Sequence, residues 1–362
     1  WRKPIFDGMR WRAAPEWLSR LLLGAPARAL AGLVGVALLV LVVSSGLTGT
    51  QAWAENFAPN FVFVTFWLGL VLLSVLFGDV YRALNPWRAI GRAVGGIFNL
   101  VAGQAAPAPL RYPERLGVWP AVLGLAGFAW LELVYAFSGF QSVGLSGHTV
   151  AVATLIYSAV TFVGMALYGV EEWTRKGEAF SVYFRMFAGM SALDVRERRL
   201  GFRRSLSGLT DWAAPAGSVA FVLLAIGATA YDGASEGFLL EPTRWLFDRF
   251  SDLGLGPVAA FRVAGTIFIA VTVGGVAGLF FGGIRGMRSV RPDLTVRELS
   301  RLFAHAFVPI ALAYVTAHYF SLFVFQEQAQ FAYLLSDPLG DGSDLFGTAS
   351  GGVDYALIGA ET

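Results

Sequence analysis

The chain contains no cysteine, and only 14% of its 362 residues are charged. Without cysteine it forms no disulfide, iron–sulfur cluster, thiolate zinc site or cysteine nucleophile. Soluble domains carry about a quarter charged residues, so this low charge, with 56% hydrophobic residues, argues against a soluble protein. The sequence also lacks a phosphate-binding loop, a dinucleotide fingerprint and a nucleophile elbow, which removes the commonest nucleotide-binding and serine-hydrolase signatures.

Seven long apolar segments account for this composition. Each is close to the roughly 20 residues that a helix needs to cross about 30 Å of hydrocarbon. We therefore predict an all-α, polytopic helical membrane protein with about seven transmembrane helices and additional interfacial amphipathic helices, forming a single membrane domain over residues 1–362. The predicted spans are about 29–47, 57–77, 118–137, 149–168, 213–231, 258–282 and 303–325.

The positive charges are confined to one set of loops. Of the 27 Lys and Arg residues, 24 lie in the segments 1–28, 78–116, 169–213 and 284–301, which alternate with acidic or uncharged loops. By the positive-inside rule these segments are cytoplasmic. We expect a bacterial inner-membrane protein with a cytoplasmic N-terminus and an external C-terminal tail at 326–362. Topology and contact with the lipid bilayer explain the basic loops, so no nucleic-acid partner is expected.

Two cytoplasmic stretches are predicted as helices at the membrane interface. Pro86 after Asn85 is a helix-start signal, and Trp87 suits the interface. Residues 177–187 are predicted as an amphipathic helix that lies on the inner leaflet. The charged run at 196–206 is predicted to be a solvated loop.

Ionisable side chains within spans are unfavourable in lipid and are therefore candidates for function. Four of them lie within roughly 10 Å of the predicted outer boundary, at about 1.5 Å rise per residue, and they come from four helices that can converge. A polar stripe at i, i+4 and i+7 on the last span is predicted to face the bundle interior. The four residues are Glu132, His148, Arg262 and His318, and the stripe is Tyr314, His318 and Ser321.

Several arrangements of this outer cluster are open. One is an ion pair between Glu132 and Arg262, with His318 hydrogen-bonded inside the bundle. Another is a metal site of His318 and Glu132 with His148 or Glu327, since imidazole and carboxylate suit zinc, copper or iron. A third is a b-type haem held by His148 and His318, and a fourth is a substrate or proton path lined by these groups.

A second group of ionisable residues lies at the opposite ends of the helices. Its members are near cytoplasmic helix ends, where charged side chains are expected at the membrane interface in any case. They are Asp79, Glu171, Glu172 and His305.

The leading functional expectation is a membrane-embedded hydrolase or redox-complex subunit that uses His318 and Glu132 around a metal. In a hydrolase the metal would activate water and Arg262 would stabilise the developing anion. The alternative is a non-catalytic transporter or scaffold subunit of a larger membrane complex, bound to other membrane subunits.

Short motifs are distributed along most of the chain. They are Phe77-Gly78, Asn85-Pro86-Trp87-Arg88, Gly177-Glu178-Ala179-Phe180-Ser181-Val182, Ala317-His318-Tyr319, Ser336-Asp337-Pro338-Leu339-Gly340 and Asp344-Leu345-Phe346-Gly347. Together they resemble a family of bacterial polytopic membrane proteins labelled fenitrothion hydrolase. The resemblance implies hydrolysis of an organophosphate triester at the membrane, and a further membrane segment beyond each end of this chain. Only His318 belongs both to these motifs and to the predicted site.

Overall fold

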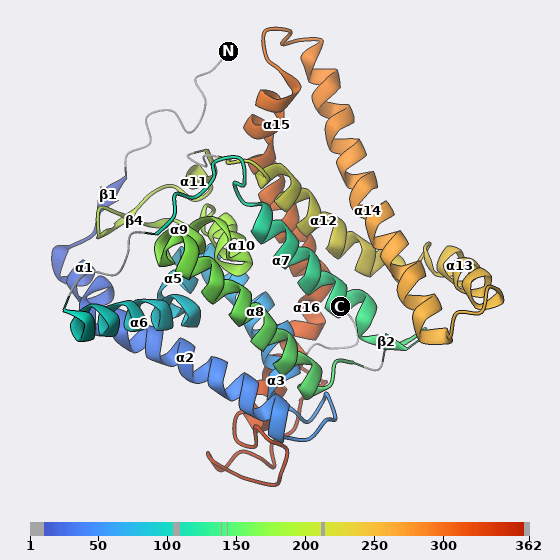
Figure 1. Cartoon of the computed structure of the whole chain (residues 1–362), viewed down its shortest axis with the longest axis horizontal. Helices are drawn as coiled ribbons and strands as arrows, with labels where there is room; N and C mark the ends of the chain where they lie inside the picture. Colours follow the sequence, from blue (N-terminus) through green and yellow to red (C-terminus); the bar gives the residue numbers. More distant parts are fainter. Residues whose placement is uncertain (1–10, 104–108, 139, 143, 211–213, 358–362) are drawn as a thin grey trace. The chain divides into compact units, whose positions relative to one another are not determined.

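Figure 1 shows the computed structural model of the chain, which describes residues 11–103, 109–138, 140–142, 144–210 and 214–357. The chain divides into two compact units, and both are discontinuous in sequence. Unit 1 contains Trp1–Tyr112, Ser146–Ala213 and Tyr319–Thr362, and unit 2 contains Pro113–Leu145 and Ala214–His318. Helix α16 (Val308–Ala329) therefore contributes residues to both units.

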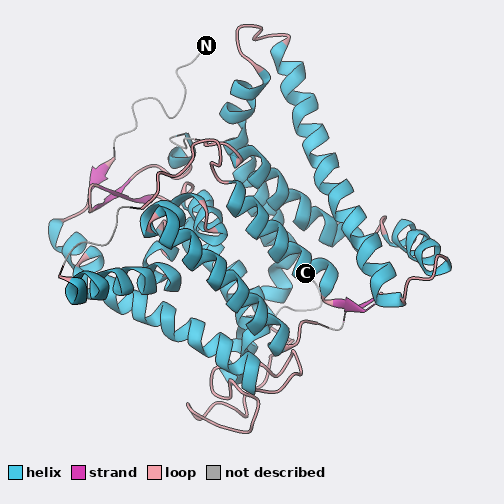
Figure 2. Cartoon of the chain, viewed as in Figure 1, coloured by secondary structure: helices cyan, strands magenta, loops and turns pink. Residues whose placement is uncertain are grey.

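Helices dominate the described residues, with only a few short strands between them (Figure 2). In this part of the chain, six helices are long and apolar enough to cross a membrane, which confirms an all-α membrane protein. Six of the predicted spans fall on them, and 118–137 falls on a shorter apolar helix, Trp119–Tyr135. The six are Glu16–Thr48, Phe57–Phe77, Gly147–Tyr168, Ser218–Ser235, Pro257–Arg288 and Val296–Leu334.

In unit 1, helix α2 (Ala25–Thr48) packs along α8 (Gly147–Tyr168) and α6 (Pro86–Ala102). Gly46 makes the α2–α8 approach possible, because a Cβ there would lie 2.4 Å from the carbonyl oxygen of Gly147. Small residues at such crossings let helix backbones approach closely in membranes. The other helical elements of unit 1 are α1 (Glu16–Leu23), α3 (Phe57–Asn60), η1 (Phe61–Gly69), α4 (Leu70–Phe77), α5 (Tyr81–Leu84), α9 (Val170–Lys176), α10 (Ala179–Ala188), α11 (Ser207–Thr210) and η4 (Gln330–Leu334).

The predicted start of α6 is confirmed. Pro86 is its first residue, and the Asn85 side chain caps it by accepting a hydrogen bond from the Arg88 backbone N–H at 2.8 Å. The placement of Trp87 at the membrane interface is wrong. This indole is buried, and its Nε1–H donates to Ser158 Oγ at 2.7 Å.

Helix α10 lies inside unit 1, so the prediction that 177–187 rests on the inner leaflet is wrong. Every α10 residue except Arg185 is buried, and the helix packs against α4. Phe66 provides the reason, because its ring contacts Phe180 and Phe184 edge-on at centroid distances of 4.8 and 5.3 Å. A helix that is apolar on nearly all sides is stabilised by burial rather than by an interface.

The charged run predicted as a solvated loop contains a β-hairpin. Strands β4 (Leu193–Arg196) and β5 (Arg199–Phe202) pair antiparallel, and β1 (Arg12–Ala13) joins the other edge of β5. The two turn residues, Glu197 and Arg198, have φ values of 49° and 64°. Two-residue hairpin turns require such left-handed backbone and usually use Asn or Gly there, so the sequence carries no turn signal.

In unit 2, α12 (Ser218–Ser235) packs against α7 (Trp119–Trp130) and α14 (Pro257–Arg288) around a core that includes Val134, Ala228 and Tyr231. The start of the predicted span 213–231 lies outside the described residues, and α12 continues one turn beyond the predicted end. The remaining elements are η2 (Leu131–Tyr135), the hairpin of β2 (Phe137–Ser138) and β3 (Gln141–Ser142), α13 (Leu240–Asp252), α15 (Val296–Ala304) and η3 (His305–Phe307).

Among the residues that the structure describes, three helices contain π-helical turns. These are η1 and η4 in unit 1 and η2 in unit 2, and each carries a polar residue within an apolar segment: Thr65, Gln330 and Glu132. Turns of this kind are rare and occur frequently at functional sites. The polar groups around Glu132 in unit 2 and around Thr65 in unit 1 are therefore candidates for function.

Candidate functional site

The central contact of unit 2 joins Asp232 on α12 to His318 on α16. Asp232 Oδ2 lies 2.9 Å from His318 Nε2, and the two side chains are 24% and 31% exposed. Gly233 permits this approach, because a Cβ there would come 3.3 Å from His318 Cε1 and 3.0 Å from the Tyr314 hydroxyl. Tyr314 and His318 of the predicted polar stripe thus lie beside each other, but all three of its residues, Ser321 included, are exposed, so the prediction that the stripe faces the bundle interior is not confirmed.

Asp232 and Tyr314 hold the imidazole of His318 in place from two sides. The Tyr314 ring stacks on it with a centroid distance of 6.0 Å and an interplanar angle of 19°. When the imidazole is neutral, a bond from Nε2–H to the Asp232 carboxylate makes Nδ1 the acceptor nitrogen. The two contacts fix the orientation of the ring.

Glu132 supplies a second carboxyl group beside this pair. It lies on the π-helical turn η2 between the buried apolar residues of the α7–α12 core, and its charge interacts with that of Asp232. Its Oε2 is buried and has no hydrogen-bond partner among the described residues. A buried carboxylate without a donor is unfavourable, so this group favours holding a proton or meeting a partner.

Arg262 does not form the expected ion pair with Glu132. Its guanidinium lies 3.8 Å from the centroid of the Tyr135 ring, a cation–π contact, and its buried Nε has no hydrogen-bond partner among the described residues. That expectation was wrong because Tyr135, one turn beyond Glu132, offers the cation a ring face that spacing alone does not reveal.

The other two predicted ligands, His148 and Glu327, belong to unit 1. His148 is exposed near the start of α8, and its backbone N–H donates to Gln51 Oε1 at 2.8 Å. Glu327 lies near Thr65 within unit 1. Across the described ranges, no three or more His, Asp or Glu side chains are grouped closely enough to hold a metal ion. Of the two imidazole nitrogens of His318 that could ligate a metal or haem, Nε2 is hydrogen-bonded to Asp232.

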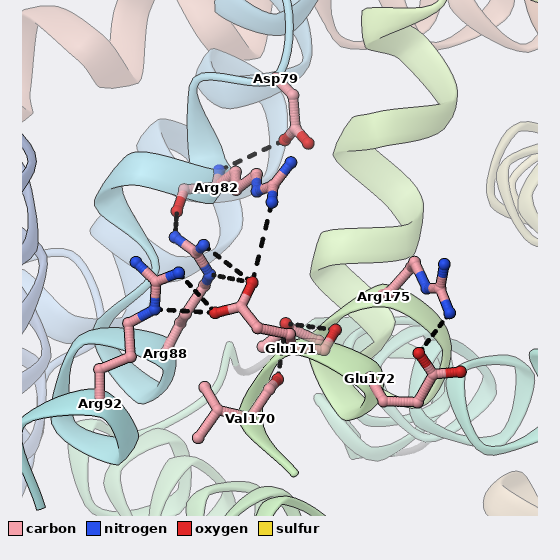
Figure 3. A network of polar contacts seen from close by, with 9 residues as sticks. Asp79, Arg82, Arg88, Arg92, Val170, Glu171, Glu172 and Arg175 are labelled. Atoms are coloured by element: carbon pink, nitrogen blue, oxygen red, sulfur yellow. Dashed lines mark hydrogen bonds and ion pairs between the residues drawn. The ribbon is translucent and has the colours of Figure 1, made fainter. Parts of the chain in front are cut away.

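The predicted inner group divides between the units, with His305 in unit 2 and the three carboxylates in unit 1. Figure 3 shows Glu171 facing three arginines: its Oε2 is 2.9 Å from Arg88 and 3.7 Å from Arg82, and its Oε1 is 2.7 Å from Arg92. Partial burial acts to raise the pKa of Glu171, but the hydrogen bonds and charges of Arg88 and Arg92 outweigh it and hold that pKa below its ordinary value. These contacts are ion pairs at helix ends.

A polar network that the sequence did not single out lies around Glu178. This side chain is 1% exposed and caps α10, accepting hydrogen bonds from the Phe180 and Ser181 backbone N–H groups at 2.9 and 2.8 Å. The Tyr157 hydroxyl and the Asn85 amide also donate to it, the latter at 3.0 Å. Burial raises the pKa of Glu178 although these donors oppose it. The segments beginning at Asn85 and Gly177, both part of the family resemblance, therefore meet in space.

Asp232 was also missed as a site residue. The sequence placed it in the acidic external loop, because the apolar run ends at Tyr231. Helix α12 continues to Ser235, so Asp232 lies within the helix and faces His318. An aspartate directly after the last apolar residue of a span was the signal that could have found it.

Comparison of the chain with protein-family models, curated proteins and solved structures finds no match. The function is therefore inferred from the side chains of the sites themselves.

Proposed function

We propose that this chain is a proton-coupled membrane transport protein in which Glu132, Asp232 and His318 bind the proton. The observation that carries the proposal is the Asp232–His318 hydrogen bond of 2.9 Å beside the buried carboxyl of Glu132. Ionisable residues within membrane spans commonly form proton relays of this composition.

The chemistry of the three groups supports proton binding. Glu132 is a buried carboxyl group without a hydrogen-bond donor among the described residues, and a charge in such a place is unfavourable, so the binding of a proton there is favoured. The hydrogen bond between His318 and Asp232 gives a direct path for a proton between the imidazole and the carboxyl group. A proton that enters the cluster can be held by any of the three groups, which is what a relay requires.

The proposed topology places this cluster toward the outside. Trp119–Tyr135 is taken as a further span, which gives seven spans in a bacterial inner membrane with a cytoplasmic N-terminus and an external tail. The basic segments support this orientation. Glu132 and Asp232 then lie near the outer ends of two spans that run outward, and other membrane subunits can associate with the lipid-exposed helix faces.

The test is proton movement in proteoliposomes that contain the purified chain and a pH-sensitive dye. After an external acid pulse, the wild-type protein should acidify the lumen faster than Asp232→Asn or Glu132→Gln. Infrared spectroscopy across a pH titration should show a carboxyl band that Glu132→Gln removes. Glu241→Gln is the matched control, since Glu241 is an exposed carboxylate of unit 2. Flux equal to that of empty liposomes, with no such band, would refute the proposal.

A hydrolase is the second candidate, favoured by the orientation of His318. Asp232 orients the imidazole, and an imidazole held by a carboxylate can act as a general base toward an attacking water. The family resemblance supports an aryl phosphotriester as substrate. A chromogenic phosphotriester assay should show His318→Ala losing more than about 100-fold in rate, in line with general-base catalysis. Metal analysis of the same sample tests the predicted zinc, copper or iron.

A further inference from the structure

Unit 1 contains a second polar group within its membrane spans, separate from the Asp232–His318 pair. It lies where the π-helical turn η1 meets the end of α16 and η4. The residues that carry the argument are Asn60, Thr65, Glu327 and Gln330.

Contacts between the two segments bring these residues together. The Asn60 Nδ2 donates to the side-chain and backbone oxygens of Gln326 at 3.0 and 3.4 Å, which ties the start of η1 to the end of α16. The Thr65 hydroxyl faces the carboxyl of Glu327, the neighbour of Gln326. A Cβ at Gly69 would lie 3.8 Å from Glu327 Oε1, so the carboxyl points at the η1 backbone.

The group is rich in buried oxygen atoms that can accept further contacts. Asn60 Oδ1, Glu327 Oε1 and Gln330 Oε1 are buried and accept no hydrogen bond at a standard distance from the described residues. The Thr65 hydroxyl, also buried, is directed at the Glu327 carboxyl and leaves its lone pairs available to an ion. Asn60 and Gln330 are only 8% and 2% exposed. The Asn60 amide nitrogen donates to the oxygens of Gln326, so the Asn60 Oδ1 atom is not used in that contact.

We propose that Asn60, Thr65, Glu327 and Gln330 form a binding site for a sodium ion. Amide, hydroxyl and carboxylate oxygens are hard ligands that suit hard cations. Calcium sites use six to eight oxygens with several carboxylates, whereas Glu327 is the one carboxylate in this set, so a single positive charge neutralises the site. Coupling-ion sites of transporters are likewise built at irregular helix segments.

Sodium binding would also remove the unfavourable burial of the Glu327 charge. The ion would join η1 to η4, and sodium would therefore stabilise unit 1 against unfolding in a saturable manner. This site goes beyond the proposed proton site, which lies in unit 2, so either proposal can fail without the other.

The test uses the purified full chain in detergent. Its thermal unfolding temperature is followed in a sodium chloride titration at constant ionic strength, with choline chloride as the replacement, and binding of radioactive sodium is measured by filtration. We expect a saturable rise in unfolding temperature and about one sodium ion bound per chain. Potassium chloride should have a smaller effect. No saturable sodium dependence and no bound sodium in the wild-type protein would overturn the proposal, leaving buried water as the partner of these oxygens.

Variants locate the ion. Glu327→Gln preserves the shape and removes the charge, so it should weaken sodium binding at least tenfold, and Thr65→Val should weaken it by a smaller factor. Glu241→Gln removes an exposed carboxylate of unit 2 and should leave sodium binding unchanged. Saturable sodium binding that persists undiminished in Glu327→Gln would place the ion elsewhere and refute the site.

Discussion

The Asp232–His318 contact predicts a measurable coupling between two spans of unit 2. We propose a double-mutant cycle with Asp232→Ala, His318→Ala and the double variant, followed by reversible unfolding in mixed micelles. The cycle isolates the pair because losses of packing that are independent at each site cancel in the difference.

The structure sets the expected magnitude. Hydrogen bonds to charged groups contribute about 1.5–3 kcal/mol, and the 24% and 31% exposure of the two side chains places this pair toward the lower end through solvent screening. We expect a coupling free energy of about 1–2 kcal/mol, equivalent to roughly a 5- to 30-fold change in the unfolding equilibrium.

The control is a pair of similar geometry at the surface of the same unit. Arg244 and Glu241 are 3.0 Å apart on α13 but 49% and 76% exposed, and exposed pairs of this kind contribute about 0.3–0.5 kcal/mol. If the Asp232–His318 coupling does not exceed that of the control pair, the two side chains do not act as a unit. Both proposed functions would then lose their main support.

Three further predictions concern buried and interhelical groups. Glu178→Ala leaves several buried donors without an acceptor and should destabilise the chain by about 3–5 kcal/mol in denaturant unfolding; a loss below about 1 kcal/mol would contradict this. Gly233→Ala forces a Cβ to 3.0 Å from the Tyr314 hydroxyl and should cost about 1–3 kcal/mol, whereas Gly282→Ala, with open space around it, should not destabilise. The pKa of Glu171 is lowered from 4.5, so its stabilising contribution is present above about pH 4.5 and is lost as pH falls through the folded-state pKa. The difference in unfolding free energy between the wild-type protein and Glu171→Gln should therefore shrink on acidification. A difference that does not change with pH would refute the ion pairs.

The membrane helices could be predicted because length and apolarity determine them almost alone. A run of about 20 apolar residues has few alternatives in lipid, so even the short helix Trp119–Tyr135 fell within its predicted range. The division into two units could not be predicted. Each unit is assembled from segments far apart in the sequence, and α16 belongs to both.

The candidate site was predicted in part. Glu132, Arg262 and His318 were selected by the unfavourable energy of ionisable groups in lipid, and all three lie in unit 2. The partners were not predictable, because pairing depends on where helices end and which faces meet. Asp232 was assigned to a loop by a helix end misplaced by four residues, and Arg262 pairs with a ring rather than with a carboxylate.

The prediction that α10 lies on the membrane surface failed for a related reason. Its sequence suits a membrane surface as well as a protein interior, and the choice depends on Phe66, which lies more than a hundred positions earlier. The local periodicity of the sequence cannot reveal a contact with a residue so far away in the chain. Asn85 and Glu178 can each be recognised in the sequence as residues that begin a helix. The hydrogen bond between their side chains depends on the tertiary fold and cannot be predicted locally.

The π-helical turns have a consequence for how the chain tolerates insertions and deletions. A π-turn holds about one residue more than the α-helical turn it replaces, so deleting a single residue from Phe61–Gly69 would restore regular winding. Because each turn still closes a full circle, the segments before and after it would keep nearly the same angular register with one residue fewer. The deletion would instead change the side chains within the turn, where Thr65 lies. A hydropathy profile cannot detect that change, because the span keeps its hydrophobicity.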